Sequence, residues 1–448
     1  MKKREFLAMG GAVPLMLAGC GGDGDGNAPV RLLNASVGYP SLGFIVNTTQ
    51  AVSGVSYGTS SPFETVQAGS VTTALTVATS ANDGTTTALA STVRSLSKDS
   101  RYTLIAYGFP DELKSVLLTE STVSPDDGKA NINVLNTSVD IGSIDVYLST
   151  TPGNDLSVAT LIATNVTGVT QSTFFSALPG SYYIIIVGSG SVAANNTDYR
   201  FTSPSPITLV NQEIVTIVVT PGLSGTLANA IVLVQGTDQA STPPTSFLNT
   251  TARLRAVTAV PAGTSISVGE GVLPAIEGPQ PSNYTVVTTG AAPGVSLNGG
   301  TPVIPAGTLV AGGDYTLLVY TDVTGTTLST KLIQDDNTAP VSTSGVKYRL
   351  INLAFDNQGS SLRMTVNNLN VATRVTFGTA SQYVEIAQPT QVDSEIDVYS
   401  GTTKIITHTQ KPVASTVGIF TDVIVSIPSS GDAQDLLLST QGLATTTS

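Results

Sequence analysis

The chain has 448 residues, of which 11% are charged, and its formal net charge at pH 7 is −12. A surplus of acidic residues repels phosphate backbones, so we expect no nucleic-acid partner. The single His and single Cys exclude a zinc site made of several such ligands, and a Ser/His/Asp triad would have to use His408. Since nothing near His408 in the sequence supplies an orienting acid or a nucleophile, we predict a protein that is not an enzyme and needs no cofactor.

The N-terminus has the pattern of an export signal. Residues 2–4 are basic, and residues 8–18 form an apolar stretch rich in small side chains. This pattern is typical of a secretory signal, and the stretch is shorter than the ~20 apolar residues that span a bilayer. It ends in Leu17-Ala18-Gly19-Cys20, which resembles the lipobox of bacterial lipoproteins. The resemblance implies a signal peptide at 1–19, cleavage before Cys20 and lipid attachment to its sulfur, which would bind the protein to a membrane.

The same region leaves two alternatives open. Residues 3–7 resemble a twin-arginine export motif with Lys3 in place of the first Arg, and a general secretory signal is the other possibility. Cys20 could instead be a buried structural residue behind an ordinary signal. Gly21 stands where an inner-membrane retention signal would carry Asp, which favours the outer membrane of a bacterial cell envelope. Residues 20–28 are predicted to form the lipidated cysteine and a flexible tether.

Four regions of the remaining chain resemble one another, which indicates internal repetition. Each opens with a strand-like alternation of apolar and polar residues, at 30–36, 130–138, 252–257 and 346–352. A late apolar strand closes each region, at 102–107, 214–219, 315–320 and 417–425. Short strands separated by turn residues, without a lasting helical period, predict an all-β protein.

A turn element links two of these regions more closely. Residues 55–63 match residues 375–383 at aromatic, Gly, Thr, Ser and aromatic positions. The second region has a looser version at 167–174, and the third lacks a clear one. Glycine permits a turn with φ > 0, and the flanking aromatics are expected in the core. Those aromatics are Tyr57, Phe63, Phe377 and Tyr383.

These motifs resemble the bacterial domain of unknown function DUF4397. Copies of that domain open with an Arg/Val-rich strand and continue to an aromatic-Gly-Thr turn. The resemblance implies immunoglobulin-like β-sandwich modules in tandem, and it supplies no catalytic residues. We therefore expect an all-β chain of tandem immunoglobulin-like β-sandwich modules after a lipoprotein signal and a flexible tether. The expected modules are 29–122, 129–236, 247–338 and 345–440, with linkers at 121–128, 236–246 and 335–345.

Acidic pairs are the remaining site candidates. Asp126 with Asp127, and Asp335 with Asp336, fall in predicted linkers. Carboxylates between tandem sandwiches can bind Ca²⁺, which accepts irregular loop geometry, so these four residues are weak calcium candidates. The alternative is that they are solvated turn acids. His408 is expected on an exposed strand.

The sequence thus favours a lipid-anchored envelope protein that acts as a structural, adhesive or binding module. We expect a string of four modules that projects a low-charge surface towards a glycan or an envelope protein. Tandem modules can multiply weak contacts by raising the effective concentration. One alternative is an accessory subunit of a surface assembly. A less favoured one is a carbohydrate-active enzyme that uses an acidic pair.

Overall fold

The computed structural model describes residues 26–445 with the exception of short segments, and those segments are 79–85, 111, 193–197, 237–241, 261–264, 267–275, 278–280, 298–299, 323–326, 343–344, 358, 388–393, 411–417, 427–433 and 440–443. The protein is all-β, which confirms the predicted class. Within the described residues the only helical elements are two 3-10 turns, η1 (Leu156–Val158) and η2 (Phe355–Asn357). None of these described helices is long and apolar enough to cross a membrane.

The strands form four units, which we define by the sheets that share a core. Unit 1 comprises β1 (Asn27–Asn34), β2 (Ser41–Val46), β3 (Thr49–Ser56), β4 (Glu64–Gln67), β5 (Gly69–Ala78), β6 (Thr86–Leu96), β7 (Tyr102–Tyr107) and β8 (Lys114–Thr119). Unit 2 comprises β9 (Ala130–Asn136), β10 (Ile144–Ser149), β11 (Ala159–Val166), β12 (Thr170–Gln171), β13 (Phe175–Ala177), β14 (Gly180–Gly188), β15 (Tyr199–Thr202), β16 (Ile207–Leu209), β17 (Ile214–Pro221), β18 (Ala228–Gln235) and β19 (Thr245–Phe247). Part of the predicted linker 236–246 therefore belongs to a strand, since β19 pairs with β18.

The other two units lie in the second half of the chain. Unit 3 comprises β20 (Thr251–Ala259), β21 (Ser265–Ile266), β22 (Ile276–Glu277), β23 (Thr285–Thr288), β24 (Asp314–Thr321) and β25 (Leu328–Asp335). Unit 4 comprises β26 (Gly345–Ala354), β27 (Leu362–Val366), β28 (Leu369–Val375), β29 (Thr379–Ala380), β30 (Val384–Ala387), β31 (Ser394–Ser400), β32 (Thr403–Gln410), β33 (Gly418–Ser426), β34 (Gln434–Ser439) and β35 (Ala444–Thr445).

All four units share one strand arrangement. The opening strand of each unit runs parallel to a late strand, in the pairs β1–β7, β9–β17, β20–β24 and β26–β33. Each late strand then forms an antiparallel hairpin with the next long strand. A second sheet has equivalent orders in units 1, 2 and 4, namely β3-β2-β5-β6, β11-β10-β14-β15 and β28-β27-β31-β32. In the described part of unit 3 it is reduced to the pair β21–β22.

Each unit has its own apolar core, which lies between the two sheets in units 1, 2 and 4 and against the inner face of the main sheet in unit 3. In unit 1, Val30 and Leu32 of β1 meet Phe44 of β2 in a cluster of buried side chains. Separate clusters of the same kind fill units 2, 3 and 4. In the opening strands the inward residues are alternate members of the strand, as the period of two requires. Every other residue of the opening strand must therefore find a different partner on the outer face of its sheet.

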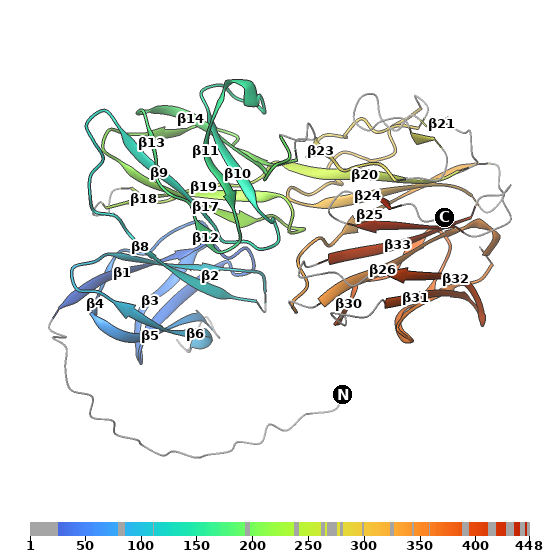
Figure 1. Ribbon diagram of the computed structural model, residues 1–448, viewed down its shortest axis with the longest axis horizontal. Helices are drawn as coiled ribbons and strands as arrows, with labels where there is room; N and C mark the ends of the chain where they lie inside the picture. Colours follow the sequence, from blue (N-terminus) through green and yellow to red (C-terminus); the bar gives the residue numbers. More distant parts are fainter. Residues whose placement is uncertain are drawn as a thin grey trace, which may run out of the picture.

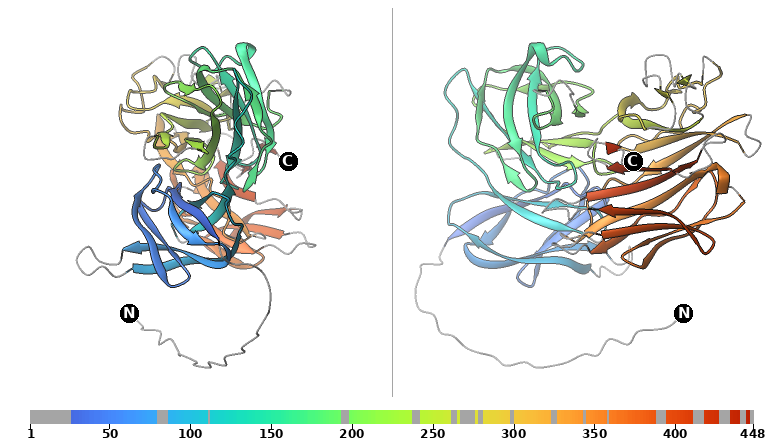
Figure 2. Two further views of the ribbon diagram at one scale, coloured as in Figure 1. Left: turned by 90° about the vertical axis from the view of Figure 1, so that its left-hand side faces the viewer. Right: turned by 45° about the vertical axis from the view of Figure 1, so that its right-hand side comes forward.

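The units cover these outer faces by packing against one another in pairs. Leu33 and Ile105 of unit 1 share a buried cluster with Leu135 and Val218 of unit 2. Units 3 and 4 form an equivalent cluster that includes Val257 of β20 and Ile351 of β26. Figures 1 and 2 show units 1 and 2 stacked beside units 3 and 4. The arrangement is thus two face-to-face pairs, which differs from the expected string.

Candidate functional site

A serine ties the opening strand of every unit to the turn that follows the second hairpin strand. Its hydroxyl accepts a hydrogen bond of 2.9–3.0 Å from a backbone N–H of that strand. The four serines are Ser61, Ser172, Ser282 and Ser381. An aromatic residue follows two positions later in each case, at Phe63, Phe174, Tyr284 and Tyr383. Unit 3 therefore keeps the Ser and aromatic positions of the turn element, although it lacks the Gly-Thr step.

In three units the same type of residue precedes the residue whose N–H is bonded to the serine. It is Arg31, Arg255 or Arg349, and in unit 2 it is Asn133. Each of the four pairs in register with a threonine of the parallel strand, namely Thr103, Thr316, Thr421 and Thr216 respectively. This repeated register places one polar group at the centre of each outer sheet face.

Each arginine stacks on the aromatic residue of its own turn. The guanidinium carbon lies 4.7 Å from the Phe63 ring centre for Arg31 and 4.6 Å from the Tyr284 ring centre for Arg255. The corresponding distance from Arg349 to Tyr383 is 4.4 Å. A ring over a desolvated guanidinium stabilises the charge.

The expected core location of the turn aromatics is therefore wrong. None of Tyr57, Phe63, Phe377 and Tyr383 belongs to a core cluster among the described residues. Phe63 and Tyr383 cover arginines, whereas Tyr57 and Phe377 contact the neighbouring unit. The physical reason is that they lie on the outer side of the opening strand, where charged groups and a second unit need an apolar cover.

In the unit 1–2 pair, Glu120 neutralises Arg31. The Arg31 Nη2 to Glu120 Oε1 distance is 2.6 Å, and both side chains are 0% exposed. Arg31 Nε donates to Thr103 Oγ1 at 2.8 Å, and Arg31 Nη2 also donates to the Val234 carbonyl of unit 2 at 3.0 Å. Unit 2 has an uncharged version of the same network, because Thr216 donates to Asn133 at 2.8 Å and Gln235 donates to Thr216.

In the unit 3–4 pair, one carboxylate serves two arginines. Asp335 Oδ1 lies 2.5 Å from Arg349 Nη2, and Asp335 Oδ2 lies 3.9 Å from Arg255 Nη2. Thr316 and Tyr284 each donate a hydrogen bond of 2.6 Å to Oδ2. Burial alone would raise the pKa of Asp335, but Arg349, Arg255 and these hydrogen bonds hold it below the usual value. Asp335 is therefore a charged structural group at neutral pH.

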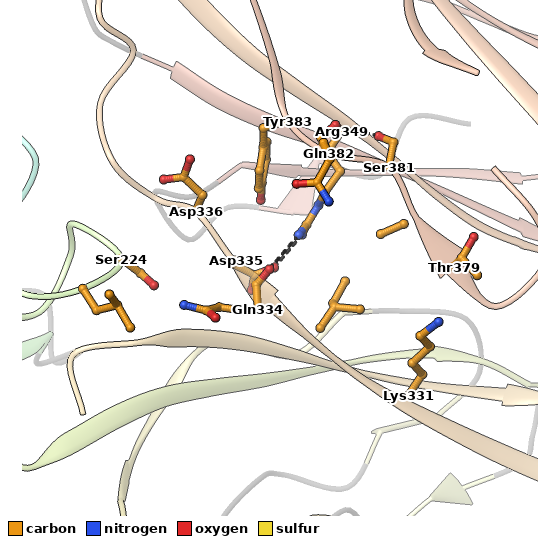
Figure 3. Close-up of a pocket in the computed structure, with 13 residues that line it drawn as sticks. Ser224, Lys331, Gln334, Asp335, Asp336, Arg349, Thr379, Ser381, Gln382 and Tyr383 are labelled. Atoms are coloured by element: carbon orange, nitrogen blue, oxygen red, sulfur yellow. Dashed lines mark hydrogen bonds and ion pairs between the residues drawn. The ribbon is translucent and has the colours of Figure 1, made fainter. Parts of the chain in front are cut away.

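A polar hollow opens beside Arg349 and Asp335. Its volume is about 550 Å³, and its walls come from three units: Leu223 and Ser224 of unit 2, β25 of unit 3, and residues 379–383 with Arg349 of unit 4. Figure 3 shows the Arg349–Asp335 ion pair in its wall and Lys331 rising from β25 on the side of Thr379. A volume of a few hundred Å³ suits a small ligand. We define this hollow as the candidate binding site.

The structure separates the predicted acidic candidates. Asp126 and Asp127 lie in the loop between β8 and β9, where Asn211 donates to Asp127 at 2.8 Å. Asp335 ends strand β25 and is buried, which corrects its placement in a linker loop. Asp336 pairs with Lys347 at 2.8 Å.

Calcium binding by these four carboxylates stays a prediction. Asp335 and Asp336 already form ion pairs with arginine and lysine side chains of the protein. Among the described residues no group of three or more His, Cys, Asp or Glu side chains could hold a metal ion. Cys20 lies outside the described residues. His408 lies on β32 as predicted, opposite Ile396, but it is half-buried instead of exposed.

Sequence reasoning missed the buried charges of both pairs. The available signal was the recurrence of Arg at one position of the opening strands, with an aromatic residue at a fixed place in the following turn. An arginine flanked by apolar residues on a buried strand requires a counterion. That requirement points to Glu120, which directly follows β8, and to Asp335, which is the last residue of β25. Each of these strands comes last in the sequence among the strands of its sheet.

The fold and the networks define a multi-unit, all-β protein with paired sheets. Residues 28–147 match the family model described as a domain of unknown function, DUF4397. The chain thus contains one such domain, which covers unit 1 and extends into β10 of unit 2. No curated protein matches the chain.

Proposed function

We propose that this protein is a lipid-anchored component of a bacterial cell envelope, and that it is a binding and structural module. In this proposal the four units are tandem copies of one immunoglobulin-like β-sandwich domain. The common parallel pairing of the opening strand and the repeated Ser, Arg and aromatic positions support the proposed repetition. The lipobox-like residues 17–20 support the anchor.

One observation carries the proposal of binding instead of catalysis. The carboxylate beside the hollow, Asp335, is held ionised by two arginines and is tied by hydrogen bonds. A carboxylate with a lowered pKa does not supply a proton as a general acid. Both of its oxygens are also engaged, Oδ1 by Arg349 and Oδ2 by Thr316 and Tyr284, which leaves neither free to act as a base or a nucleophile. The same contacts join units 3 and 4 in the wall of the hollow. A polar hollow on an anchored protein suits recognition of a ligand.

The anchor has a direct test. Replacing Cys20 with Ala removes the sulfur that would carry the lipid, so we expect loss of palmitate labelling and release of the protein from the membrane fraction. Ser41→Ala is a matched control, because Ser41 is an exposed serine at the start of β2 and its replacement leaves Cys20 intact. Retention of the Cys20→Ala protein in membranes, without label in either protein, would contradict the anchor.

A further inference from the structure

Some of the charged side chains that line the hollow form ion pairs with described residues, and one does not. Asp335 is paired with Arg349 and Arg255, and Asp336 is paired with Lys347. Lys331 also lines the hollow, and it is exposed and forms no ion pair with any residue that the structure describes. The hollow therefore offers one uncompensated cation, which fits a single negative charge on a ligand.

Two amides provide the other available groups. Gln334 of β25 and Gln382 of the unit 4 turn both line the hollow and are exposed. Figure 3 places them on different walls, with Gln334 on the unit 3 side and Gln382 on the unit 4 side. The hydroxyls of Thr379 and Ser381 already donate to the backbone, so the amides are the freer groups. Each amide both donates and accepts, which matches the hydroxyl groups of a sugar.

We infer that the hollow binds a sugar unit that carries one carboxylate. Lys331 would pair with the carboxylate, and Gln334 and Gln382 would bond to ring hydroxyls. A phosphate, with its higher charge, would require a cluster of free arginines, and the arginine of the hollow is already engaged by Asp335. An apolar ligand would leave Lys331 and both amides without water or partner. The inference rests on the binding role proposed above.

The test measures binding of defined sugars to the full chain in detergent by calorimetry. The probes are a galacturonate trisaccharide, the galactose trisaccharide that lacks the carboxylates, a disaccharide with muramic acid, and acetate. We expect at least tenfold tighter binding of a carboxylated sugar than of galactose trisaccharide. The muramic acid and galacturonate probes distinguish a cell-wall source from another acidic polysaccharide. We expect acetate to bind weakly, because it offers no hydroxyls to the amides.

Three variants connect the binding to these residues. Lys331→Gln should weaken the binding of the carboxylated sugar about tenfold, because one charge-assisted contact is lost, and leave the affinity for galactose trisaccharide unchanged. Lys331→Arg should restore the preference for the carboxylated sugar. Gln382→Ala should weaken the binding of both sugars to a similar degree. Lys114→Gln is the matched control, since Lys114 is an exposed lysine on β8, the equivalent edge strand of unit 1.

The outcomes separate this inference from the proposed function. Equal binding of acidic and neutral sugars, equal binding of acetate, or an unchanged affinity in Lys331→Gln would overturn the inference. So would the absence of any binding by the acidic sugars at millimolar concentration. Binding of some other ligand would then leave the binding role intact, and the anchor is tested separately through Cys20.

Discussion

Arg31 shows at the scale of one residue why the paired units hold together. An ion buried without its partner costs several kcal/mol, so each member of the Arg31–Glu120 pair depends on the other. Thr103, the Val234 carbonyl and the Phe63 ring also contact the guanidinium, and of its three nitrogens only Nη1 has no hydrogen-bond partner among the described residues. The interface is therefore specific as well as apolar, because a shifted register would leave one of these groups unpaired.

Replacing Arg31 with Ala should destabilise the protein by about 3–5 kcal/mol, because Glu120 would remain buried without a cation. Chemical denaturation followed by circular dichroism measures the effect as a lower midpoint. A drop below about 1 kcal/mol would show that Glu120 finds water or another partner.

Unit 2 supplies the matched control. Its uncharged network suggests the double replacement Arg31→Asn with Glu120→Gln, which transfers the Asn133 and Gln235 side chains to unit 1. A neutral hydrogen-bonded network avoids the cost of an unpaired charge. We therefore expect the double variant to be more stable than Arg31→Ala, and equal instability of the two would contradict the role assigned to the charge.

At the scale of elements, the Gly-Thr turn joins neighbouring units. Gly58 has φ of 75°, and a Cβ there would lie 2.7 Å from Ser246 Cβ of unit 2. Gly378 has φ of 70°, and a Cβ there would lie 2.5 Å from the Tyr320 hydroxyl of unit 3. The predicted need for φ > 0 is confirmed at both glycines. The close approach of the neighbouring unit is a second reason for glycine at these positions. It cannot be inferred from the local sequence, because the contacting residues are far away in the chain.

Gly54 allows the two reasons to be measured separately. Its φ of 71° resembles that of Gly58, but nothing lies within 4 Å of a Cβ built there. Gly54→Ala should cost about 1–2 kcal/mol from backbone strain alone. Gly58→Ala should cost more, because Ser246 must also move, and denaturation midpoints of the two variants give the comparison. Equal losses would mean that the contact between units adjusts without cost.

Local patterns predicted the strands, the turn glycines and the near absence of helix, because those features depend on the period of two and on backbone freedom. They could not locate the aromatics, since Phe63 and Leu32 look equally apolar in sequence although they face different sides of a sheet. They also misplaced Asp335, because its burial depends on Arg349, which lies in the next unit. Contacts between distant strands decided each of these cases.

At the scale of the whole molecule, acid should weaken the unit 3–4 pair before it unfolds the individual cores. The folded pKa of Asp335 lies below its unfolded value, which is about 3.9, so its contribution is present above that pH. The contribution is lost as the pH falls through the folded pKa. Thermal unfolding between pH 7 and pH 2 should therefore show a decline below about pH 4.

Asp335→Asn separates this effect from general acid denaturation. The amide cannot balance Arg349 and Arg255, so the variant should be less stable at pH 7, and its stability should fall less steeply below about pH 4. Asp127→Asn is the control, because Asp127 lies in an exposed loop. Parallel pH profiles for the wild type and Asp335→Asn would contradict the assignment.

The parallel strand pairs also fix an order of assembly. Val30 cannot join Tyr102, its partner in the sheet, until about seventy intervening residues have been synthesised, and the outer face of unit 1 waits longer still for Ile231 and Leu233. Sheets closed by such distant segments form slowly. During synthesis from the N-terminus, unit 1 can therefore close its own sheets after Thr119, but the apolar outer face with Leu33 and Ile105 stays uncovered until more than half of the sequence has emerged. Folding by pairs, each completed by its later member, is the consequence.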